Sequence, residues 1–277
     1  MKTLYISDLD GTLLNRKAEV SVQTAEVLNS LIDEGLHFSV ATARTSATIG
    51  HILHNVRLNM PVVLMNGVCI FDMQNQSFVK TEFIPQQAAK ILFSLLCEHG
   101  QTGFLYTLSN NMLNIYYENL NTTQRRTFYE ERVRKYGKKF TRIDSFSRLT
   151  VANAVYVSIC ERKELVEPVY KSLKEVPGLR AEFYQDIYSK DSWYLEVCAM
   201  KASKQNAVAY LRKVYGFDRV VCFGDNMNDL PMFEAADVRI AVSNAKAEVK
   251  ARADVIIGSH EEDSVAKWIA ADRKQKL

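Results

Sequence analysis

No run of apolar residues in this sequence approaches the roughly 20 that a helix needs to cross a bilayer. The amino-terminal segment also lacks the uninterrupted apolar stretch of a secretory signal, because Asp8 and Asp10 interrupt it early. Internal repeats and low-complexity stretches are missing as well. The sequence therefore predicts an intracellular protein without a membrane partner.

Paired cysteines are absent too. The five cysteines are scattered, none forms a CxxC motif, and most lie in apolar runs such as Val221-Cys222-Phe223. An odd, dispersed set of this kind is typical of reduced, buried thiols. This pattern predicts a cytoplasmic protein.

The chain has no strong excess of charge of one sign. Its formal net charge of +3 is too small to indicate nucleic acid or an acidic membrane as the main partner. One dense basic stretch runs from Arg125 to Arg142, but Glu130 and Glu131 interrupt it, so a solvated helix face explains it better than an RNA site. The length of 277 residues and the apolar fraction of 47% suit one large or two modest globular domains.

Strand and helix patterns alternate through the first third of the chain. An apolar strand is followed by a helix that Ser21 can cap and Gly35 can end. Further strands are expected over residues 36–41 and 62–64, and the second of these leads to Asn66-Gly67. Two successive strand–helix–strand units predict a parallel sheet with right-handed crossovers.

The middle of the chain mixes paired strands with helices. Helices are expected over residues 85–100, 122–136 and 163–175, and strands over residues 102–108, 112–116, 154–160, 180–184 and 193–197. This mixture predicts a separate α+β unit with boundaries near residues 83 and 190.

The last third returns to the first pattern. Ser203 can cap a helix through Tyr215, and strands over residues 219–223, 238–242 and 254–257 follow, the last two separated by a helix. One α/β core is thus expected to be split by an inserted domain.

The predicted fold is α/β. Residues 1–82 and 191–277 form a doubly wound, mainly parallel sheet of the Rossmann type. Residues 83–190 form the inserted α+β domain.

Two carboxylates end the first apolar strand, in the run Ser7-Asp8-Leu9-Asp10-Gly11. Side chains alternate faces in an extended segment, so Asp8 and Asp10 point the same way. Close carboxylates repel unless a cation lies between them, and oxygen ligands suit Mg²⁺, which substrate phosphate usually helps to coordinate. Gly11 allows a tight turn and close approach of a ligand. On these residues alone, an acidic strand end before a surface turn is the alternative.

Three further polar groups are expected at the same edge of the sheet. They are Thr42 to Arg44, Lys204, and Asp225 to Asp229, each at the carboxyl end of a core strand or the start of the following helix. Open α/β sheets bind their ligands at that edge. The convergence of these groups with Asp8 and Asp10 predicts one functional site.

The motifs at these positions resemble those of a known family. DLDGTLL at residues 8–14, ATAR at 41–44, the lone Lys204 and GDNMND at 224–229 are similar to the four signature motifs of the haloacid dehalogenase superfamily. DxDGT combined with GDxxND at this separation is a specific signal. The resemblance covers essentially the whole chain.

Other features resemble the Cof-type phosphatase branch of this superfamily. They are Asn66-Gly67, the stretch from Glu196 to Lys204, and Ser243-Asn244-Ala245. A large α+β cap inserted after Asn66-Gly67 also fits that branch, although the cap is recognised by its position and size. The resemblance implies that the core is catalytic and that the insertion is a cap.

The resemblance also implies a mechanism for hydrolysis of a phosphate monoester. Asp8 would attack phosphorus and form an aspartyl-phosphate, which splits a very slow reaction into two easier steps. Asp10 would protonate the leaving alcohol and then accept a proton from the attacking water. Mg²⁺ would be held by the Asp8 carboxylate, the Asp10 backbone carbonyl and Asp225.

A second group of residues would bind phosphate or support the site. The resemblance implies phosphate contacts for Leu9, Thr42, Ala43, Lys204 and Asn228, and supporting roles for Asp229, Asn66 and Gly67. Family members often have glycine where this chain has Ala43, and usually have glycine where Gln205 follows Lys204. Arg44 is expected to make a supporting contact only.

Several of these residues also have plainer explanations. Thr42 suits a helix N-cap, Lys204 suits a surface lysine with Lys201 as its rival in the motif, and the Asp225 loop suits an ordinary turn. His51 and His54 lie three apart on a helix, but no further metal ligands accompany them. Aromatic residues of the insertion are expected in its core rather than in ligand stacking; they include Tyr106, Tyr116, Tyr117 and Trp193.

These patterns predict a Mg²⁺-dependent cytoplasmic phosphatase, monomeric or homodimeric, that acts on a small phosphorylated metabolite. A sugar phosphate is the first expectation, with a nucleotide, flavin mononucleotide or pyridoxal phosphate as alternatives. A phosphomutase of related architecture stays open, because the sequence does not tell whether the phosphoryl group passes to a sugar or to water. A signalling module that only holds a phosphoryl group also stays open, although such modules are far shorter and have no cap.

Overall fold

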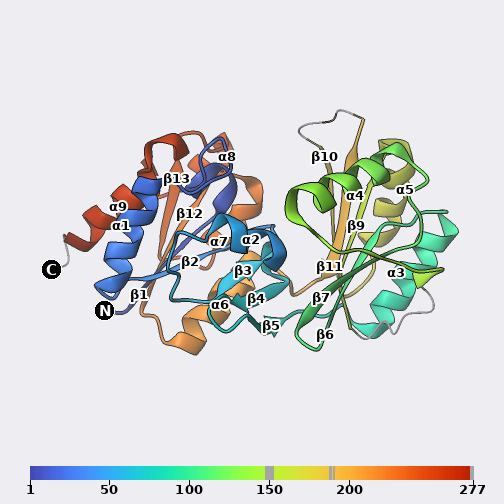
Figure 1. The fold of residues 1–277 in the computed structure, drawn as a ribbon, viewed down its shortest axis with the longest axis horizontal. Helices are drawn as coiled ribbons and strands as arrows, with labels where there is room; N and C mark the ends of the chain where they lie inside the picture. Colours follow the sequence, from blue (N-terminus) through green and yellow to red (C-terminus); the bar gives the residue numbers. More distant parts are fainter. Residues whose placement is uncertain (147–152, 187–188, 190, 275–277) are drawn as a thin grey trace. The chain divides into compact units, whose positions relative to one another are not determined.

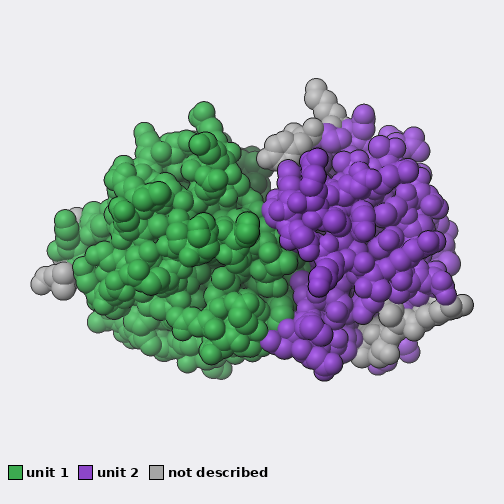
Figure 2. All heavy atoms as spheres, viewed as in Figure 1, with its two compact units in different colours: residues 1–80, 203–277 green, residues 81–202 purple. Residues whose placement is uncertain are grey.

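The computed structural model describes residues 1–146, 153–186, 189 and 191–274 (Figure 1). The chain divides into two compact units (Figure 2). Unit 1 consists of Met1–Lys80 and Ser203–Leu277, and unit 2 consists of Thr81–Ala202.

A five-stranded parallel sheet forms the centre of unit 1. Its strands, in spatial order, are β14 (Val255–Ile257), β13 (Val238–Val242), β12 (Arg219–Gly224), β1 (Thr3–Ser7) and β2 (His37–Val40). Ser7 pairs with Phe223 on one side and Val40 on the other, so the carboxyl ends of β12, β1 and β2 are level. The predicted parallel sheet is confirmed.

Helices cover both faces of this sheet. The Phe223 ring packs edge-on against Trp268 of α9 (Ser264–Lys274). The neighbouring Cys222 points to the opposite face, where α6 (Lys204–Tyr215) lies. Lys204, the first residue of this helix, is close enough for its charge to act on the Cys222 thiol. Helix α1 (Val22–Asp33) lies beside α9, as Figure 1 shows. The doubly wound arrangement predicted from the sequence is therefore present.

Local sequence accounts for the ends of these helices. The Ser21 side chain accepts a hydrogen bond from the Thr24 backbone at the start of α1, as predicted, and Gly35 follows its end with φ 87°. Ser203 caps α6 in the same way by accepting from the Asn206 backbone, and Gly216 ends it in the left-handed region.

A small antiparallel sheet extends unit 1 beyond β2. It is formed by β3 (Val62–Leu64), β4 (Cys69–Asp72) and β5 (Ser77–Thr81), and a parallel bridge between Ala41 and Val63 joins β3 to the end of β2. The sequence patterns predicted β3 but not the hairpin of β4 and β5. The remaining helices of unit 1 are short and lie between strands: α2 (Ser46–Ile52), α7 (Leu230–Phe233) and α8 (Ala247–Lys250).

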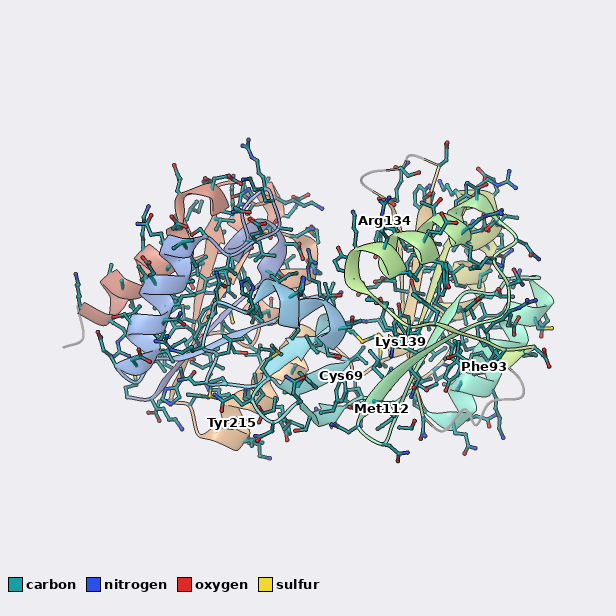
Figure 3. The ribbon with its side chains drawn as sticks, in the orientation of Figure 1. Cys69, Phe93, Met112, Arg134, Lys139 and Tyr215 are labelled. Carbon is teal, nitrogen blue, oxygen red and sulfur yellow. The ribbon has the colours of Figure 1, made fainter. Side chains whose placement is uncertain are left out.

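Unit 2 is an α+β unit, as predicted. Its six-stranded sheet has the order β10 (Leu179–Gln185), β11 (Trp193–Ala199), β9 (Ala154–Glu161), β6 (Phe104–Ser109), β7 (Met112–Tyr117) and β8 (Thr141–Arg142). Its helices are α3 (Gln86–Glu98), α4 (Thr123–Tyr136) and α5 (Lys163–Leu173). Leu92 of α3, Val166 of α5 and Val157 of β9 belong to one buried apolar core. Phe93 of α3, labelled in Figure 3, packs beside Phe146.

The second boundary of the insertion differs from the predicted one. We expected the insertion over residues 83–190, but unit 2 begins at Thr81 and extends to Ala202; residue 190 itself lies outside the described residues. The reason is that β11 pairs with β9 and β10 along its whole length. Residue patterns reveal a strand at Trp193–Ala199, but they do not reveal to which sheet it belongs.

Two further expectations can be compared with the structure. The basic stretch was expected to be a solvated helix face, and Arg126, Arg134 and Lys135 of α4 are exposed as expected. Arg125 is the exception: it is only 4% exposed and lies 3.7 Å from Glu161. The aromatic residues of the insertion pack together as expected: Tyr106 lies edge-on against Tyr156, and Trp193 stacks on Phe183.

No helix in the described part of the chain is long and apolar enough to cross a membrane.

All five cysteines are free, and four of them are buried. Cys69 at the start of β4 (Figure 3) is one of the buried thiols, whereas Cys97 is exposed.

Candidate functional site

Three core strands of unit 1 are followed by polar residues at the same edge of the sheet. Asp8 directly follows β1, Asp225 directly follows β12, and Thr42 follows the end of β2. The Asp8 backbone N–H donates to the Phe223 carbonyl at 2.9 Å, and the Thr42 N–H donates to the Val63 carbonyl at 2.9 Å. The level strand ends therefore bring residues far apart in the sequence together, as predicted.

Lys204 lies at the centre of this edge. Its ammonium donates to Asp8 Oδ1 at 2.5 Å and to Asp229 Oδ1 at 2.7 Å, and its side chain is 1% exposed. Burial alone would lower the pKa of Lys204, but the carboxylates of Asp229 and Asp8 outweigh burial and raise it. The ammonium therefore stays charged. The surface-lysine explanation is wrong, and the rival Lys201 is exposed and belongs to unit 2.

Asp229 organises the loop after β12. Its side chain is fully buried, and its Oδ2 accepts hydrogen bonds from the backbone N–H groups of Asp225 at 2.9 Å and Asn226 at 3.0 Å. Gly224 is required here, since a Cβ atom at that position would lie 2.6 Å from the Cβ of Asp229. Asp229 thus links the loop that carries Asp225 to Lys204.

A cluster of carboxylates surrounds this lysine. Asp8, Asp225 and Asp229 each offer an oxygen, and these atoms lie within 4.8 Å of one another. Thr12 donates to Asp225 Oδ1 at 2.7 Å, and a Cβ atom on Gly11 would lie 2.6 Å from Asp225 Oδ2, which explains why glycine stands there.

The electrostatics of the cluster favour a bound cation. Burial and the nearby Asp229 raise the pKa of Asp8 well above its ordinary value, although Lys204 lowers it. Burial also raises the pKa of Asp225 to about 6, against the effect of the hydrogen bond from Thr12. One lysine therefore does not fully compensate the buried carboxylates. An oxygen-only donor set of this kind fits a hard divalent cation such as Mg²⁺.

Asp10 lies outside this carboxylate cluster. Its side chain is 52% exposed and is held by Arg44, whose Nε donates to Asp10 Oδ2 at 2.8 Å and whose Nη2 donates to Oδ1 at 2.6 Å. The bidentate contact fixes the orientation of the Asp10 carboxylate. The sequence predicted a supporting contact for Arg44 but did not identify Asp10 as its partner.

The predicted phosphate-binding residues occupy the same edge. Thr42 is buried, and its Oγ1 accepts a hydrogen bond from the Arg44 backbone at 3.2 Å. Helix α2 has Thr45 at its N-cap position, so the alternative that Thr42 caps this helix is wrong. Leu9 is buried in the turn after β1, and Ala43 is exposed.

Asn66 and Asn228 lie in two different loops, and their side chains form a hydrogen bond. The Asn228 carboxamide donates to Asn66 Oδ1 at 3.2 Å. Met65, Asn66 and Gly67 all have positive φ, which is unusual for two consecutive non-glycine residues. A Cβ atom on Gly67 would lie 2.1 Å from the Ser203 carbonyl oxygen, so this turn packs directly against the start of α6.

Some contacts of the site were not predicted from the sequence. They are the hydrogen bond from Thr12 to Asp225, that from Ser7 Oγ to the Asp8 carbonyl at 2.7 Å, and that from Asn244 to the Gly11 carbonyl at 2.7 Å. Thr12 and Asn244 stand within motifs identified from the sequence and Ser7 directly precedes one, but the motifs do not indicate the partners of these side chains. His51 and His54 are both exposed, as expected for surface residues.

The comparisons with known proteins agree with this geometry. The profile of a family described as haloacid dehalogenase-like hydrolase matches residues 5–269. The pyridoxal phosphate phosphatase YbhA of Escherichia coli is 27% identical over 271 residues, which cover 95% of each chain. The 5-amino-6-(5-phospho-D-ribitylamino)uracil phosphatase YcsE of Bacillus subtilis is 24% identical over 268 residues, which cover 96% of this chain and 94% of the relative.

A solved structure shows the same fold. A haloacid dehalogenase-like hydrolase from Bacteroides thetaiotaomicron superimposes with a TM-score of 0.79 at 22% identity, over 98% of this chain and 99% of the other. The likeness therefore includes the inserted unit as well as the core.

Proposed function

Because the chain belongs to the haloacid dehalogenase-like hydrolases and is a phosphoric monoester hydrolase of the Cof-type branch, we propose that its active site is the edge of the unit 1 sheet where Asp8 lies. The reaction we propose is Mg²⁺-dependent hydrolysis of a small phosphorylated metabolite. The observation that carries the proposal is the buried Lys204 between Asp8 and Asp229, at 2.5 and 2.7 Å.

Asp8 is the proposed nucleophile. One of its oxygens attacks phosphorus, the bond from phosphorus to the substrate oxygen breaks, and an aspartyl-phosphate forms. Water then attacks that phosphorus, releases inorganic phosphate and restores the carboxylate. Lys204 supports this role, because its ammonium holds one Asp8 oxygen and offers positive charge to the phosphoryl oxygens.

Asp10 is the proposed general acid and base. It gives a proton to the leaving alcohol in the first step and accepts one from the attacking water in the second. Its exposure of 52% leaves it accessible to substrate and solvent, and the contact with Arg44 fixes its direction.

The proposed phosphate contacts are Thr42, Ala43, Asn228 and the backbone at Leu9. Supporting roles are proposed for Asp229, Asn66 and Gly67.

We propose Mg²⁺ as the cofactor. Asp8 and Asp225 supply carboxylate oxygens, and the Asp10 backbone carbonyl is a further proposed ligand. Asp229 supports them by holding the backbone of the loop that carries Asp225. A bound Mg²⁺ would neutralise the repulsion between the phosphate and the Asp8 carboxylate.

The substrate is proposed by class. A sugar phosphate remains our first candidate, with a nucleotide and flavin mononucleotide as alternatives. Pyridoxal phosphate and a phosphorylated ribitylaminopyrimidine gain support from the names of the two curated relatives. We also propose a cytoplasmic location, which five free cysteines favour, and a monomeric or homodimeric state.

The test is a screen for phosphate release over a panel of these metabolites, with and without Mg²⁺. Asp8→Asn is the matched negative control. Release that continues for many turnovers per chain supports the hydrolase and excludes a module that only holds a phosphoryl group. A requirement for a sugar bisphosphate activator, with no net phosphate release, would instead indicate the phosphomutase.

A further inference from the structure

The motif Ser243-Asn244-Ala245 has no role in the proposed function, yet it lies beside the proposed active site. It directly follows β13, and β13 pairs with β12, so this loop lies at the same edge of the sheet as Asp225. The loop is hydrogen-bonded to both segments that carry proposed metal ligands. Asn244 contacts the turn after β1, and the Lys246 N–H donates to the Asp225 carbonyl at 2.9 Å.

The Asn244 carboxamide is hydrogen-bonded at both ends. Its Nδ2 donates to the Gly11 carbonyl at 2.7 Å, and its Oδ1 accepts from the His260 backbone N–H at 3.0 Å. A flipped carboxamide would face a carbonyl with its oxygen and an N–H with its nitrogen, so only one orientation satisfies both partners. His260 is itself held to the turn after β1, because its ring Nδ1 donates to the Leu14 carbonyl at 2.7 Å. An exposed side chain is thus fixed in one position.

The Gly11 carbonyl belongs to the backbone that connects two parts of the proposed metal site. Asp10 and Gly11 have non-helical φ and ψ in the turn after β1, so this part of the turn depends on other contacts for its position. The peptide before Gly11 contains the Asp10 carbonyl, which is the proposed backbone ligand. The peptide after Gly11 leads to Thr12, whose Oγ1 donates to Asp225 Oδ1 at 2.7 Å. Asn244 therefore holds the backbone between the Asp10 carbonyl and the contact with Asp225.

These contacts close a ring of hydrogen bonds. The ring runs from Gly11 through Thr12 to the Asp225 carboxylate. It continues from the Asp225 carbonyl to Lys246 and returns along the loop to Asn244 and Gly11. The ring is tightly packed, because a Cβ atom on Gly11 would lie 2.6 Å from Asp225 Oδ2. A shift of the turn after β1 would therefore change its position relative to Asp225.

We propose that Asn244 is a positioning residue for the metal site. It holds the turn after β1 against Asp225, so that the Asp10 carbonyl and the Asp225 carboxylate keep the separation that a small cation requires. Mg²⁺ demands near-ideal octahedral coordination, whereas Ca²⁺ accepts irregular coordination with longer bonds. Loss of the Asn244 contact should therefore weaken the binding of Mg²⁺ more than that of Ca²⁺. The inference rests on the proposed function, because it requires that Mg²⁺ binds at this edge of the sheet.

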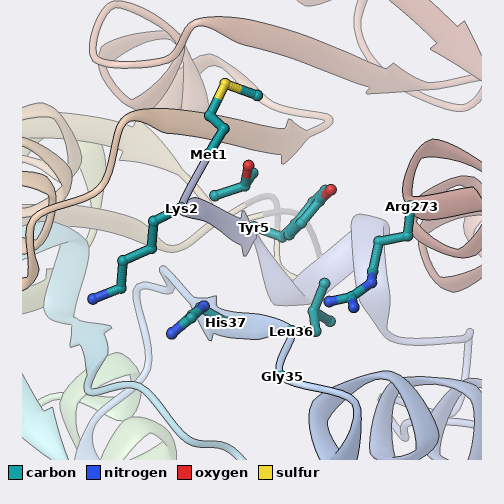
Figure 4. Close-up of a pocket in the computed structure, with 8 residues that line it drawn as sticks. Met1, Lys2, Tyr5, Gly35, Leu36, His37 and Arg273 are labelled. Carbon is teal, nitrogen blue, oxygen red and sulfur yellow. The ribbon is translucent and has the colours of Figure 1, made fainter. Parts of the chain in front are cut away.

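Asn59 provides a matched control at the opposite edge of the same sheet. Its side chain is also exposed, its Nδ2 donates to the Leu36 carbonyl at 2.7 Å, and its Oδ1 accepts from the Phe38 N–H at 3.2 Å. Leu36 directly precedes β2, and Figure 4 shows it beside His37 among the residues that line a pocket at this edge. Asn59→Ala therefore removes the same kind of contacts as Asn244→Ala, at the end of β2 that lies away from the proposed metal site.

The test is isothermal titration calorimetry of the parent protein and its variants with Mg²⁺ and, separately, with Ca²⁺. In Asn244→Ala we expect the Kd of Mg²⁺ to rise about tenfold, as is typical for loss of a residue that orients metal ligands. The Kd of Ca²⁺ should rise less than about threefold. Asn59→Ala should leave both values unchanged, and Asp225→Asn should weaken the binding of both cations. Melting temperatures of the metal-free variants confirm that they are folded.

A selective loss of Mg²⁺ binding in Asn244→Ala, absent from Asn59→Ala, supports the positioning role even if the phosphate-release screen fails. Unchanged Mg²⁺ binding in Asn244→Ala, an equal loss for both cations, or the same loss in Asn59→Ala would overturn it. If the parent protein does not bind Mg²⁺, or if Asp225→Asn binds it equally well, the proposed metal site is wrong and so is the role of Asn244.

Discussion

The Lys204 ammonium lies 2.5 Å from Asp8 Oδ1, and both side chains are almost completely buried. Its second partner, Asp229, is fully buried as well. Removal of the lysine would leave two carboxylates close together without a counter-charge in a medium of low dielectric constant.

We therefore expect Lys204→Met to lower the free energy of unfolding by about 3–5 kcal/mol. The measurement is urea denaturation of the metal-free protein at neutral pH. Lys90→Met on the exposed surface is the control and should change stability by less than about 0.5 kcal/mol. A loss at Lys204 no larger than that of the control would show that the buried ion pairs do not stabilise the fold.

Asp8→Asn should abolish turnover and leave the fold intact. The change is nearly isosteric and keeps an acceptor for the Lys204 ammonium, while an amide cannot act as the nucleophile. We expect kcat to fall by more than about 10³-fold, with a melting temperature close to that of the parent protein. Full activity in this variant would refute covalent catalysis by Asp8.

The raised pKa of Asp225 predicts how pH and Mg²⁺ act on stability. Its pKa rises from 3.8 to about 6 on folding, so the metal-free native state holds the proton more tightly than the unfolded chain. The stability that this proton supplies is present below pH 3.8 and is lost as the pH rises through about 6. Asp8 acts in the same direction, because burial raises its pKa too.

Mg²⁺ should therefore stabilise the protein more at pH 7.5 than at pH 5, because only the deprotonated carboxylates bind the ion. With free Mg²⁺ at about 100 times its Kd, the gain at the higher pH should be about 2.7 kcal/mol. Thermal unfolding with and without Mg²⁺ at both pH values provides the measurement. Asp225→Asn is the control and should lose most of the gain, whereas an equal gain at both pH values would contradict the assignment of this cluster as the metal site.

The sequence identifies the residues of the site better than it identifies their partners. Asp8, Thr42, Lys204 and Asp225 could be predicted to meet, because each follows or precedes an apolar strand or helix and the ends of parallel strands are level. The contacts of Asp229 with the loop amides could not, since they depend on how that loop folds back over a distance of three or four residues.

The same limit applies to features that depend on tertiary pairing. Arg44 stands directly after Thr42 and Ala43, yet its partner Asp10 lies 34 positions away and is found only once β1 and β2 are side by side. Strand β11 was recognised from its apolar residues, but its place between β9 and β10 was not. The residue types of a strand do not show which strands it pairs with, so the second boundary predicted near residue 190 differs from the division after Ala202.

Gly67→Ala should destabilise the protein and reduce its activity. The added Cβ would lie 2.1 Å from the Ser203 carbonyl oxygen, and φ at this position is 99°. A backbone group cannot move aside as a side chain can, so we expect a loss of at least about 2–3 kcal/mol, together with displacement of the start of α6 and Lys204. Urea denaturation and phosphatase assays measure the two effects.

Gly216→Ala is the matched control for this change. Gly216 also has positive φ, at 66°, but nothing lies within 4 Å of the added Cβ. Only the cost of the left-handed conformation remains, about 1–2 kcal/mol, and activity should be unchanged. Equal losses in the two variants would mean that the close contact between Gly67 and Ser203 has no energetic role.

Arg44 should affect the rate of the chemical step more than substrate binding. Its guanidinium holds both oxygens of Asp10, at 2.8 and 2.6 Å, and a misdirected Asp10 would transfer protons less efficiently. We expect Arg44→Gln to lower kcat about 10–100-fold, with a much smaller change in KM. Arg44→Lys should restore little of the loss, since an ammonium cannot form the bidentate contact. If KM rises while kcat stays constant in both variants, Arg44 binds substrate rather than positions Asp10.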